Sequence, residues 1–328
     1  MNRQAKIIGT GSYLPEKVLS NSDLEKLVDT TDEWIVSRTG MRERRIAAAD
    51  EFTSDMGVKA AARAIEDAGC GAEDINLILV ATLTPDYVFP STACLIQASL
   101  NMVNAAAVDL QAACSGYIYA LSIAKAFVET GVYRNVLIVA AEKLSSIVDY
   151  EDRSTCVLFG DGASSCVVSA EGKGLLIRDI SLGSDGNQTE ILKMPGGGCR
   201  QPASKETIDQ RLHYIKMGGK EVFKHAVRRM ESSCKECIER AGLSKEEISW
   251  LIPHQANIRI IEAIAKRFAV PRDRVYITVD KYGNTSASSV GIALDELLKQ
   301  QTPAAGDHLL LTAFGAGLTW GSAVLTHE

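Results

Sequence analysis

The stretch Val108-Asp-Leu-Gln-Ala-Ala-Cys-Ser-Gly-Tyr-Ile-Tyr-Ala-Leu121 joins a short apolar run to a longer apolar segment with helical spacing. Cys114 lies at the junction, and small residues flank it on both sides. The pattern predicts a strand, a turn and a helix, with the thiol at the helix N-terminus. There the positive end of the helix dipole and unpaired backbone N–H groups favour the thiolate over the thiol. By itself, the stretch is also compatible with an inert core cysteine.

Outward from this stretch, apolar runs of strand length alternate with segments that have helical spacing. A later segment, residues 156–169, predicts a hairpin. Strands that alternate with helices indicate an α/β protein with a mainly parallel sheet covered by helices. The main expected elements are strands at 75–82, 105–110 and 135–142 and helices at 54–69, 91–100 and 114–131.

The second half of the chain repeats the first at an offset of 173 residues. The segment from Ile65 matches the segment from Ile238 without a gap, and Ala120-Leu121 matches Ala293-Leu294. Self-similarity of this length predicts two βαβ-rich halves, residues 1–172 and 173–328, related by a pseudo-two-fold axis. Loops at equivalent strand ends should then meet at the junction, where open α/β folds bind ligands. This arrangement would bring His254 and Asn284 to Cys114.

Composition narrows the class of protein. The 328 residues carry a formal charge of −6, which argues against a general nucleic-acid binder. No apolar run approaches the roughly 18 residues of a membrane span, and the N-terminal residues lack the apolar segment of a signal peptide, so we expect a cytoplasmic protein. The eight cysteines show no framework spacing, and we expect them to be reduced. The lone Cys234-x-x-Cys237 pair predicts two helix cysteines, and we expect no metal site.

Three motifs contain the potential active-site residues: Gln111-Ala-Ala-Cys-Ser-Gly116, Pro253-His-Gln-Ala-Asn257 and Gly283-Asn-Thr-Ser-Ala-Ser-Ser289. A thiol nucleophile with a histidine and an amide suits acyl transfer through a thioester. Together the three motifs resemble β-ketoacyl-acyl carrier protein synthase III, a family of the thiolase superfamily. The motifs Gly9-Thr-Gly-Ser-Tyr-Leu-Pro15, Asp32-Glu-Trp-Ile-Val-Ser-Arg-Thr-Gly40, Phe159-Gly-Asp-Gly-Ala163 and Phe314–Ala323 extend the resemblance over essentially the whole chain.

The resemblance implies a layered α-β-α-β-α fold and a decarboxylative Claisen condensation that starts fatty acid chains. Cys114 would take an acyl group, acetyl being the expected primer, from acyl-CoA, which is a substrate; no cofactor or metal is implied. The enolate formed from malonyl-acyl carrier protein would then attack the thioester. The backbone N–H groups of Cys114 and Ala316 would hold the oxyanion, and His254 with Asn284 would stabilise the charge that develops during decarboxylation.

The resemblance also implies substrate contacts and partners. Trp34 and Arg153 match the pair that sandwiches the CoA adenine, and Phe89 matches a residue that reaches into the partner subunit of a homodimer. Basic residues on two helices form a potential docking patch for an acidic acyl carrier protein. The further matching positions are Thr30 and Arg38 near the nucleotide, Gly219 and Asn257 along the pantetheine arm, and Lys224, Arg259, Lys266 and Arg267 in the patch.

Some positions depart from the family pattern. Ala316 stands where a glycine is frequent, and Lys220 stands where an asparagine often contacts the pantetheine. Residues 194–202 form a glycine-rich loop near the expected entrance. Three alternatives stay open: a secondary-metabolite ketosynthase or acyltransferase, a non-catalytic protein that binds acyl chains or carrier proteins, and a thiol hydrolase. The presence of Cys114, His254 and Asn284 counts against the non-catalytic protein.

Overall fold

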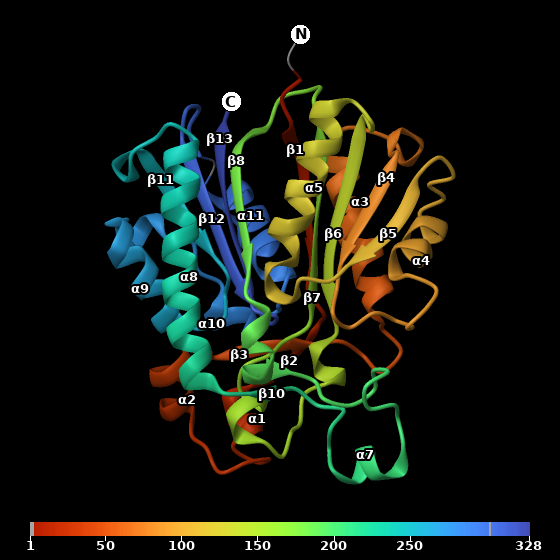
Figure 1. The fold of residues 1–328 in the computed structure, drawn as a ribbon, viewed down its shortest axis with the longest axis vertical. Coiled ribbons are helices and arrows are strands. Elements are labelled where there is room, and N and C mark those ends of the chain that lie inside the picture. The colour runs from red at the N-terminus through yellow and green to blue at the C-terminus, as the bar shows by residue number, and fades with distance from the viewer. Residues whose placement is uncertain (1–2, 302) are drawn as a thin grey trace.

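The computed structural model describes residues 3–301 and 303–328 and has helices on both faces of a large mixed sheet (Figure 1). The strands are β1 (Lys6–Tyr13), β2 (Lys17–Ser20), β3 (Glu43–Ile46), β4 (Leu77–Ala81), β5 (Ala106–Leu110), β6 (Asn135–Glu142), β7 (Gly162–Ser169), β8 (Leu175–Ser184), β9 (Leu192–Lys193), β10 (Lys216–Met217), β11 (Ile248–Pro253), β12 (His308–Gly315) and β13 (Thr319–His327). The α-helices are α1 (Asn21–Leu24), α2 (Asp32–Thr39), α3 (Thr53–Asp67), α4 (Thr92–Ser99), α5 (Gly116–Thr130), α6 (Arg153–Cys156), α7 (Lys205–Asp209), α8 (Gly219–Arg240), α9 (Ile258–Phe268), α10 (Val279–Tyr282) and α11 (Ser288–Gln300).

The main sheet has the order β11-β12-β13-β8-β1-β7-β6-β4-β5. The expectation of a mainly parallel sheet was wrong. Pairs β4-β5, β4-β6 and β11-β12 are parallel, whereas β6-β7, β7-β1, β1-β8, β8-β13 and β13-β12 are antiparallel. The link from β12 to β13 is only residues 316–318, and so short a connection can join only antiparallel neighbours. The predicted hairpin at 156–169 was also wrong, because α6 ends at Cys156 and β7 is a single strand.

The two arms of the sheet have corresponding strand orders. Strands β5-β4-β6-β7-β1 form one arm, and β11-β12-β13-β8 form the other; β1 and β8 meet over only two residue pairs. Val275 makes a single parallel bridge to Leu251 of β11, at the position that β5 occupies beside β4. The fold therefore has the duplicated halves that the repeat indicated. The boundary between residues 172 and 173 stays a prediction.

Alternation along the strands explains the layers. Leu77, Leu79 and Ala81 of β4 face a central core with α5 and α11, whereas Ile78 and Val80 face an outer core with α3. In the other arm, β12 sends alternate residues to the central core and to a second outer core under α8 and α9. Because α5 packs between the two arms, most of its apolar residues are buried in the central core, whereas Lys125 and Glu129 form an ion pair on its more exposed side.

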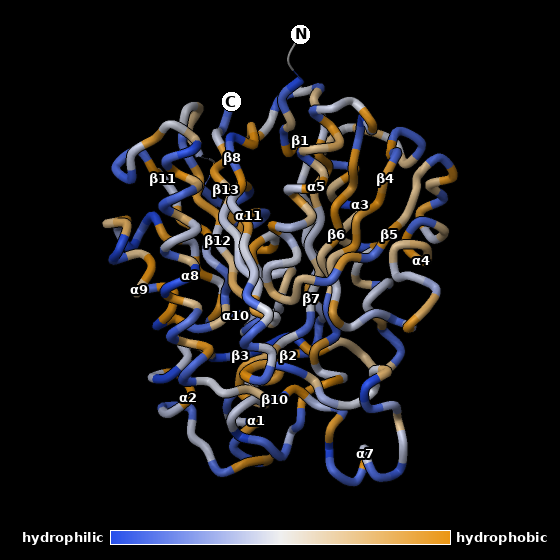
Figure 2. Tube along the Cα trace, viewed as in Figure 1, coloured by the Kyte–Doolittle hydropathy of each residue, from blue (hydrophilic) through white to orange (hydrophobic). Residues whose placement is uncertain are grey.

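The order of layers is thus α-β-α-β-α, with α5 and α11 in the middle. Apolar residues follow the strands and the middle helices, and polar residues dominate the periphery (Figure 2). The N-termini of α5 and α11 come together at the junction of the two arms, together with the turn that precedes each helix. No helix within residues 3–301 and 303–328 is long and apolar enough to cross a membrane.

Candidate active site

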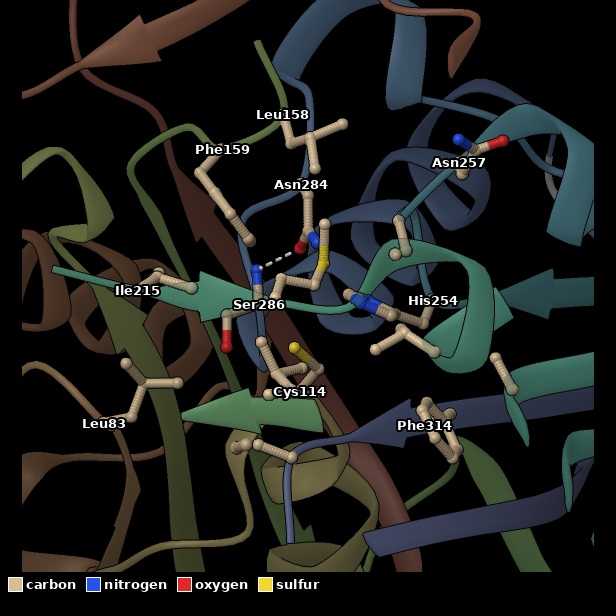
Figure 3. Close-up of a pocket in the computed structure, with 18 of the residues that line it drawn as sticks. Leu83, Cys114, Leu158, Phe159, Ile215, His254, Asn257, Asn284, Ser286 and Phe314 are labelled. Atoms are coloured by element: carbon tan, nitrogen blue, oxygen red, sulfur yellow. Dashed lines mark hydrogen bonds between the residues drawn. The ribbon is translucent and has the colours of Figure 1, made fainter. Parts of the chain in front are cut away.

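A cavity of about 660 Å³ opens at the junction of the two arms. Cys114, His254 and Asn284 line it together, although they come from three separate segments (Figure 3). Cys114 lies in the turn before α5, His254 directly follows β11, and Asn284 precedes α11. Their exposed fractions are 8%, 3% and 6%, so each side chain presents only a small part of its surface to the cavity.

Cys114 sits in a strained turn that points its side chain at the cavity. The preceding residue, Ala113, has φ = 44°, a left-handed conformation that costs a non-glycine residue about 1–2 kcal/mol. Such strain persists where the surrounding structure over-determines it, as it does at many functional sites. Here the Ser115 hydroxyl donates to the Ala112 carbonyl at 2.7 Å and thereby holds the turn.

The protonation state of Cys114 differs from the expectation. The sequence predicted that the helix dipole would favour the thiolate, but burial raises the pKa of the Cys114 thiol to about 12. The nearby Ser286 hydroxyl opposes this rise, and the negative charge of Glu142 adds to it. The resting group at neutral pH is therefore a thiol, and a proton must leave it before the sulfur can attack a thioester.

His254 is a neutral donor in this site. Burial lowers the pKa of its imidazole to about 3. Its Nδ1 lies 2.6 Å from Ser289 Oγ, and the same Oγ accepts a hydrogen bond from the Gln255 N–H at 3.3 Å. No other acceptor for the Ser289 proton is found among the described residues, so the hydroxyl donates to Nδ1, and this assignment places the imidazole proton on Nε2. The Nε2–H is thus the group available to the cavity.

Asn284 has a fixed amide orientation. Its Oδ1 accepts a hydrogen bond from the Ser286 N–H at 2.8 Å (Figure 3), so its Nδ2 is the end left for the cavity. The backbone of Asn284 is held by Leu158 and Gly160, through bonds of 2.9 and 3.0 Å. Asn284 and His254 therefore present two neutral N–H donors, an arrangement suited to an oxygen that gains negative charge.

Two backbone N–H groups lie on the side of the thiol. Those of Cys114 and Ala316 have no acceptor within the described part of the chain. The peptide that follows Ala316 is held by Thr319, whose hydroxyl donates to the Ala316 carbonyl at 3.0 Å. The neighbouring Gly315 lies so close that a Cβ there would be 2.6 Å from the Cys114 nitrogen. The turn from β12 to β13 therefore packs directly on the backbone of the cysteine.

Several of the predicted substrate contacts surround the cavity. Arg38, Gly219 and Asn257 line it. Asn257 also joins two elements, because its Nδ2 donates to the Arg38 carbonyl at 3.0 Å and its Oδ1 caps α9. Trp34 and Arg153 do not line the cavity, but the guanidinium stacks 5.2 Å from the indole ring.

Thr30 and Phe89 lie outside the cavity of their own chain. The Thr30 hydroxyl is buried and has no hydrogen-bond partner among the described residues. The Phe89 ring is 85% exposed on the loop before α4. In the loop of residues 194–202, Met194 is the residue that reaches the cavity wall.

The predicted basic patch is divided by acidic neighbours. Lys224 lies 3.9 Å from Glu221, and Arg267 forms a close ion pair with Glu231 of α8. Arg259 stacks on a neighbouring phenylalanine, Phe223, at 5.6 Å. Together with Lys266, these four cationic side chains are exposed on α8 and α9.

Sequence reasoning missed four residues that build the site. Ser286 and Ser289 belong to the motif before α11, but their roles depend on contacts with Cys114 and His254. Glu142 is the one charged residue of β6 and directly follows six apolar residues, which was a usable signal. Arg44, which the sequence motifs did not single out, is fully buried; it donates to Asn21 at 2.6 Å, and it also bonds the Val157 carbonyl.

No group of three or more His, Cys, Asp or Glu side chains within the described ranges is arranged to hold a metal ion. Cys234 and Cys237 lie on α8, as predicted, and all eight cysteines are free thiols.

Comparisons with known proteins agree on one family. The profile described as 3-oxoacyl-[acyl-carrier-protein (ACP)] synthase III matches residues 108–186, and the profile for its C terminal matches residues 238–327. A protein of Chlamydia caviae named beta-ketoacyl-[acyl-carrier-protein] synthase III is 59% identical over 324 residues, which cover 98% of this chain and 97% of that protein.

Solved structures give the same result. The 3-oxoacyl-[acyl-carrier-protein] synthase III of Aquifex aeolicus superposes with a TM-score of 0.91 at 49% identity, over 98% of this chain and all of the other. The priming β-ketosynthase of the R1128 polyketide pathway has a TM-score of 0.92 at 37% identity, over 100% of this chain and 97% of the other.

Proposed function

This chain belongs to the β-ketoacyl-acyl carrier protein synthase III family, and from that premise we propose how its residues perform the condensation. The enzyme joins an acyl group from acyl-CoA to malonyl-acyl carrier protein, releases CoA and CO₂, and starts a fatty acid chain. The observation that carries the proposal is the meeting of Cys114, His254 and Asn284 in one cavity.

In the first half-reaction, Cys114 attacks the thioester carbon of acyl-CoA and becomes acylated. Negative charge moves to the thioester oxygen, and the N–H groups of Cys114 and Ala316 are free to hold it. Removing one such donor typically costs about 10²–10³ in rate. The cavity of about 660 Å³ lies within the size range of small-molecule sites.

In the second half-reaction, malonyl-acyl carrier protein loses CO₂ and its enolate attacks the acyl-enzyme. Charge then develops on the malonyl thioester oxygen, which accepts hydrogen bonds from His254 Nε2 and Asn284 Nδ2. A neutral histidine is suited to this role, because it donates without needing a proton from the solvent, and burial keeps its pKa at about 3. No cofactor or metal takes part in these steps.

The CoA substrate binds above the cavity. Trp34 and Arg153 already stack on each other at 5.2 Å, and an adenine inserted between them would gain stacking and cation–π contacts. Arg38 attracts the phosphates, and Thr30 lies near the nucleotide. Gly219 and Asn257 follow the pantetheine arm. The exposed Lys224, Arg259, Lys266 and Arg267 attract the acidic carrier protein.

The active enzyme is a homodimer built on β5. This strand is the edge of the main sheet, and its exposed Val108 belongs to an apolar hollow that also contains Ile123 and Phe127. An apolar edge strand pairs readily with a second copy. The 85% exposed Phe89, on the loop before α4, would enter the acyl pocket of that copy. A cytoplasmic location fits the eight free cysteines.

Intact-mass analysis tests the reaction. The purified enzyme is incubated with acetyl-CoA and with longer and branched acyl-CoAs, before and after addition of malonyl-acyl carrier protein. We expect an acyl adduct that disappears with CO₂ release and formation of a β-ketoacyl product, and no adduct on Cys114→Ala.

Absence of an adduct from every acyl-CoA would overturn the proposal. Loss of the adduct without a new carbon–carbon bond would indicate a hydrolase. A strong preference for primers outside fatty acid synthesis would favour a polyketide-type priming enzyme, such as the R1128 neighbour.

A further inference from the structure

Glu142 is a buried carboxylate that the two half-reactions above leave unused. It ends β6 and has no exposed surface. Its oxygens accept hydrogen bonds from the hydroxyls of Thr82 and Thr84, at 3.2 and 2.7 Å, and from the Leu83 and Thr84 N–H groups. Burying a carboxylate costs several kcal/mol unless hydrogen bonds or opposite charges compensate for the lost water. Here five hydrogen-bond donors from two other segments compensate for the burial of Glu142.

The fifth donor links Glu142 to the nucleophile. The Ser286 hydroxyl donates to Glu142 Oε1 at 3.1 Å. The Ser286 and Cys114 side chains lie next to each other in the lining of the cavity (Figure 3), and the nearby hydroxyl lowers the pKa of the Cys114 thiol, against the larger rise that burial causes. Ser286 has φ = 53°, a left-handed backbone conformation. The three groups thus form a line in which the Ser286 hydroxyl is bonded to the Glu142 carboxylate and is next to the Cys114 sulfur.

We propose that Glu142 is a positioning residue that, through Ser286, receives the Cys114 proton during acylation. The proposal rests on the proposed role of Cys114 as the nucleophile. The thiol S–H bond breaks as the proton passes to Ser286 Oγ. The Ser286 O–H bond breaks in turn, and that proton binds the Glu142 carboxylate. The thiolate attacks the acyl-CoA carbon, and the departing CoA thiolate takes a proton back through the same line.

Charge balance favours this route over loss of the proton to water. Before the transfer the buried site contains one negative charge, on Glu142, and afterwards it contains one, on the sulfur. A thiolate formed beside an ionised Glu142 would instead place two negative charges in a low-dielectric site. The same repulsion is part of the reason that the pKa of the thiol is high.

The surroundings of Glu142 support a group that changes its protonation state. The segment after β4 supplies only hydroxyl and N–H donors, the turn before α11 supplies Ser286, and the turn before α5 supplies the thiol as the facing titratable group. The next residue, Lys143, points its ammonium to the carbonyls of Ala48 and Glu51. Burial raises the pKa of the Glu142 carboxyl to about 7, so it can both accept and release a proton near neutral pH.

The test measures the rate of Cys114 acylation by acetyl-CoA between about pH 5.5 and about pH 9, using rapid quench and intact mass. In the unchanged enzyme the rate should fall on the acid side as Glu142 becomes protonated. In Glu142→Gln, the glutamine keeps an acceptor oxygen but cannot take the proton. We expect acylation to slow by about 10²-fold. We also expect the fall in rate on the acid side, the acid limb of the pH profile, to disappear.

Ser286→Ala removes only the middle of the line and should show the same two effects. It keeps the proposal testable if Glu142→Gln does not fold. Asp161→Asn is the matched control, since Asp161 is a fully buried carboxylate that accepts from Ser145 and Ala47 and lies outside the cavity. It should lower stability while the acid limb persists.

The outcomes separate a proton relay from two simpler roles. If Glu142 only repels the thiolate, Glu142→Gln would acylate as fast as or faster than the unchanged enzyme, and the proposal is overturned. If Glu142 only stabilises the segments that bond it, Glu142→Gln would lose thermal stability and keep the acid limb. That result also overturns the proposal. If the unchanged enzyme forms no adduct at all, the proposed function itself fails.

Discussion

The turn that leads into α5 and the turn that leads into α11 share a backbone conformation and differ in side chains. Ala113 in the first and Ser286 in the second are separated by the repeat offset of 173, and both are left-handed, with φ of 44° and 53°. In each turn a serine two positions later donates its hydroxyl back to a carbonyl, at 2.7 Å for Ser115 and 2.9 Å for Ser288.

The chemistry of the two turns diverges at neighbouring positions. The repeat pairs Cys114 with Ala287, and it pairs Gln111 with Asn284. It also pairs Glu142, at the end of β6, with Gly315 at the end of β12. One turn thus presents the thiol and has a glycine packed on its backbone, whereas the other presents an amide and a hydroxyl backed by a carboxylate. Duplication supplied two equivalent scaffolds, and each now supports a different part of the reaction.

The largest effect should come from the amide position. Asn284→Ala removes a donor to the oxygen that gains charge during decarboxylation, so condensation should fall about 10²–10³-fold. The equivalent Gln111→Ala also alters the cavity lining, but it should change condensation by less than about tenfold. Product formation from the preformed acyl-enzyme measures both. Equal losses in the two variants would show that the turns are not functionally distinct.

A slightly smaller effect, on the rate of acylation, should follow from adding a side chain at Gly315. Its new methyl in Gly315→Ala would lie 2.6 Å from the Cys114 nitrogen and would displace an oxyanion donor. We expect acylation to slow by about 10²-fold, as measured by intact mass. Gly186→Ala is the control, because a Cβ there meets nothing within 4 Å. Acylation at the normal rate in Gly315→Ala would rule out this packing as a constraint on the nucleophile.

Loss of the Ser289 hydroxyl, which bonds His254 Nδ1, should slow condensation about tenfold. Ser289→Ala removes the donor to Nδ1 and frees the other imidazole tautomer, so condensation should slow while acylation stays unchanged. Nitrogen NMR of the imidazole would report the tautomer directly. Ser288→Ala is the control, since its hydroxyl bonds only the Thr285 carbonyl among the described residues. An unaltered tautomer in Ser289→Ala would contradict the assignment.

The smallest effect should appear in stability. Ala113→Gly relieves a left-handed alanine, a gain that offsets the added chain entropy, so the free energy of unfolding should change by no more than about 1 kcal/mol. Ala287→Gly, at φ = −59°, relieves nothing and should cost about 1 kcal/mol or more. Denaturant titration would compare them. A larger cost for Ala113→Gly would mean that its methyl contributes more than the strain removes.

Much of the fold could be predicted because it depends on local patterns. The apolar strands at 77–81 and 135–142, the helix after Cys114 and the repeat were all recognisable. The antiparallel pairings were not, because strand direction depends on how short connections such as residues 316–318 close. Arg44 was missed for a related reason, since its hydrogen-bond partners Asn21 and Val157 are distant in the chain.

The sequence by itself determined which residues could react: one cysteine at a helix start, and a histidine and an asparagine at equivalent ends of a repeated unit. Only the tertiary structure decided their states. Burial makes Cys114 a thiol with a pKa of about 12, against the expectation of a resting thiolate, and it makes His254 a neutral hydrogen-bond donor with a pKa of about 3. Desolvation depends on every segment packed around a group, and so do the contacts of Ser286 and Glu142.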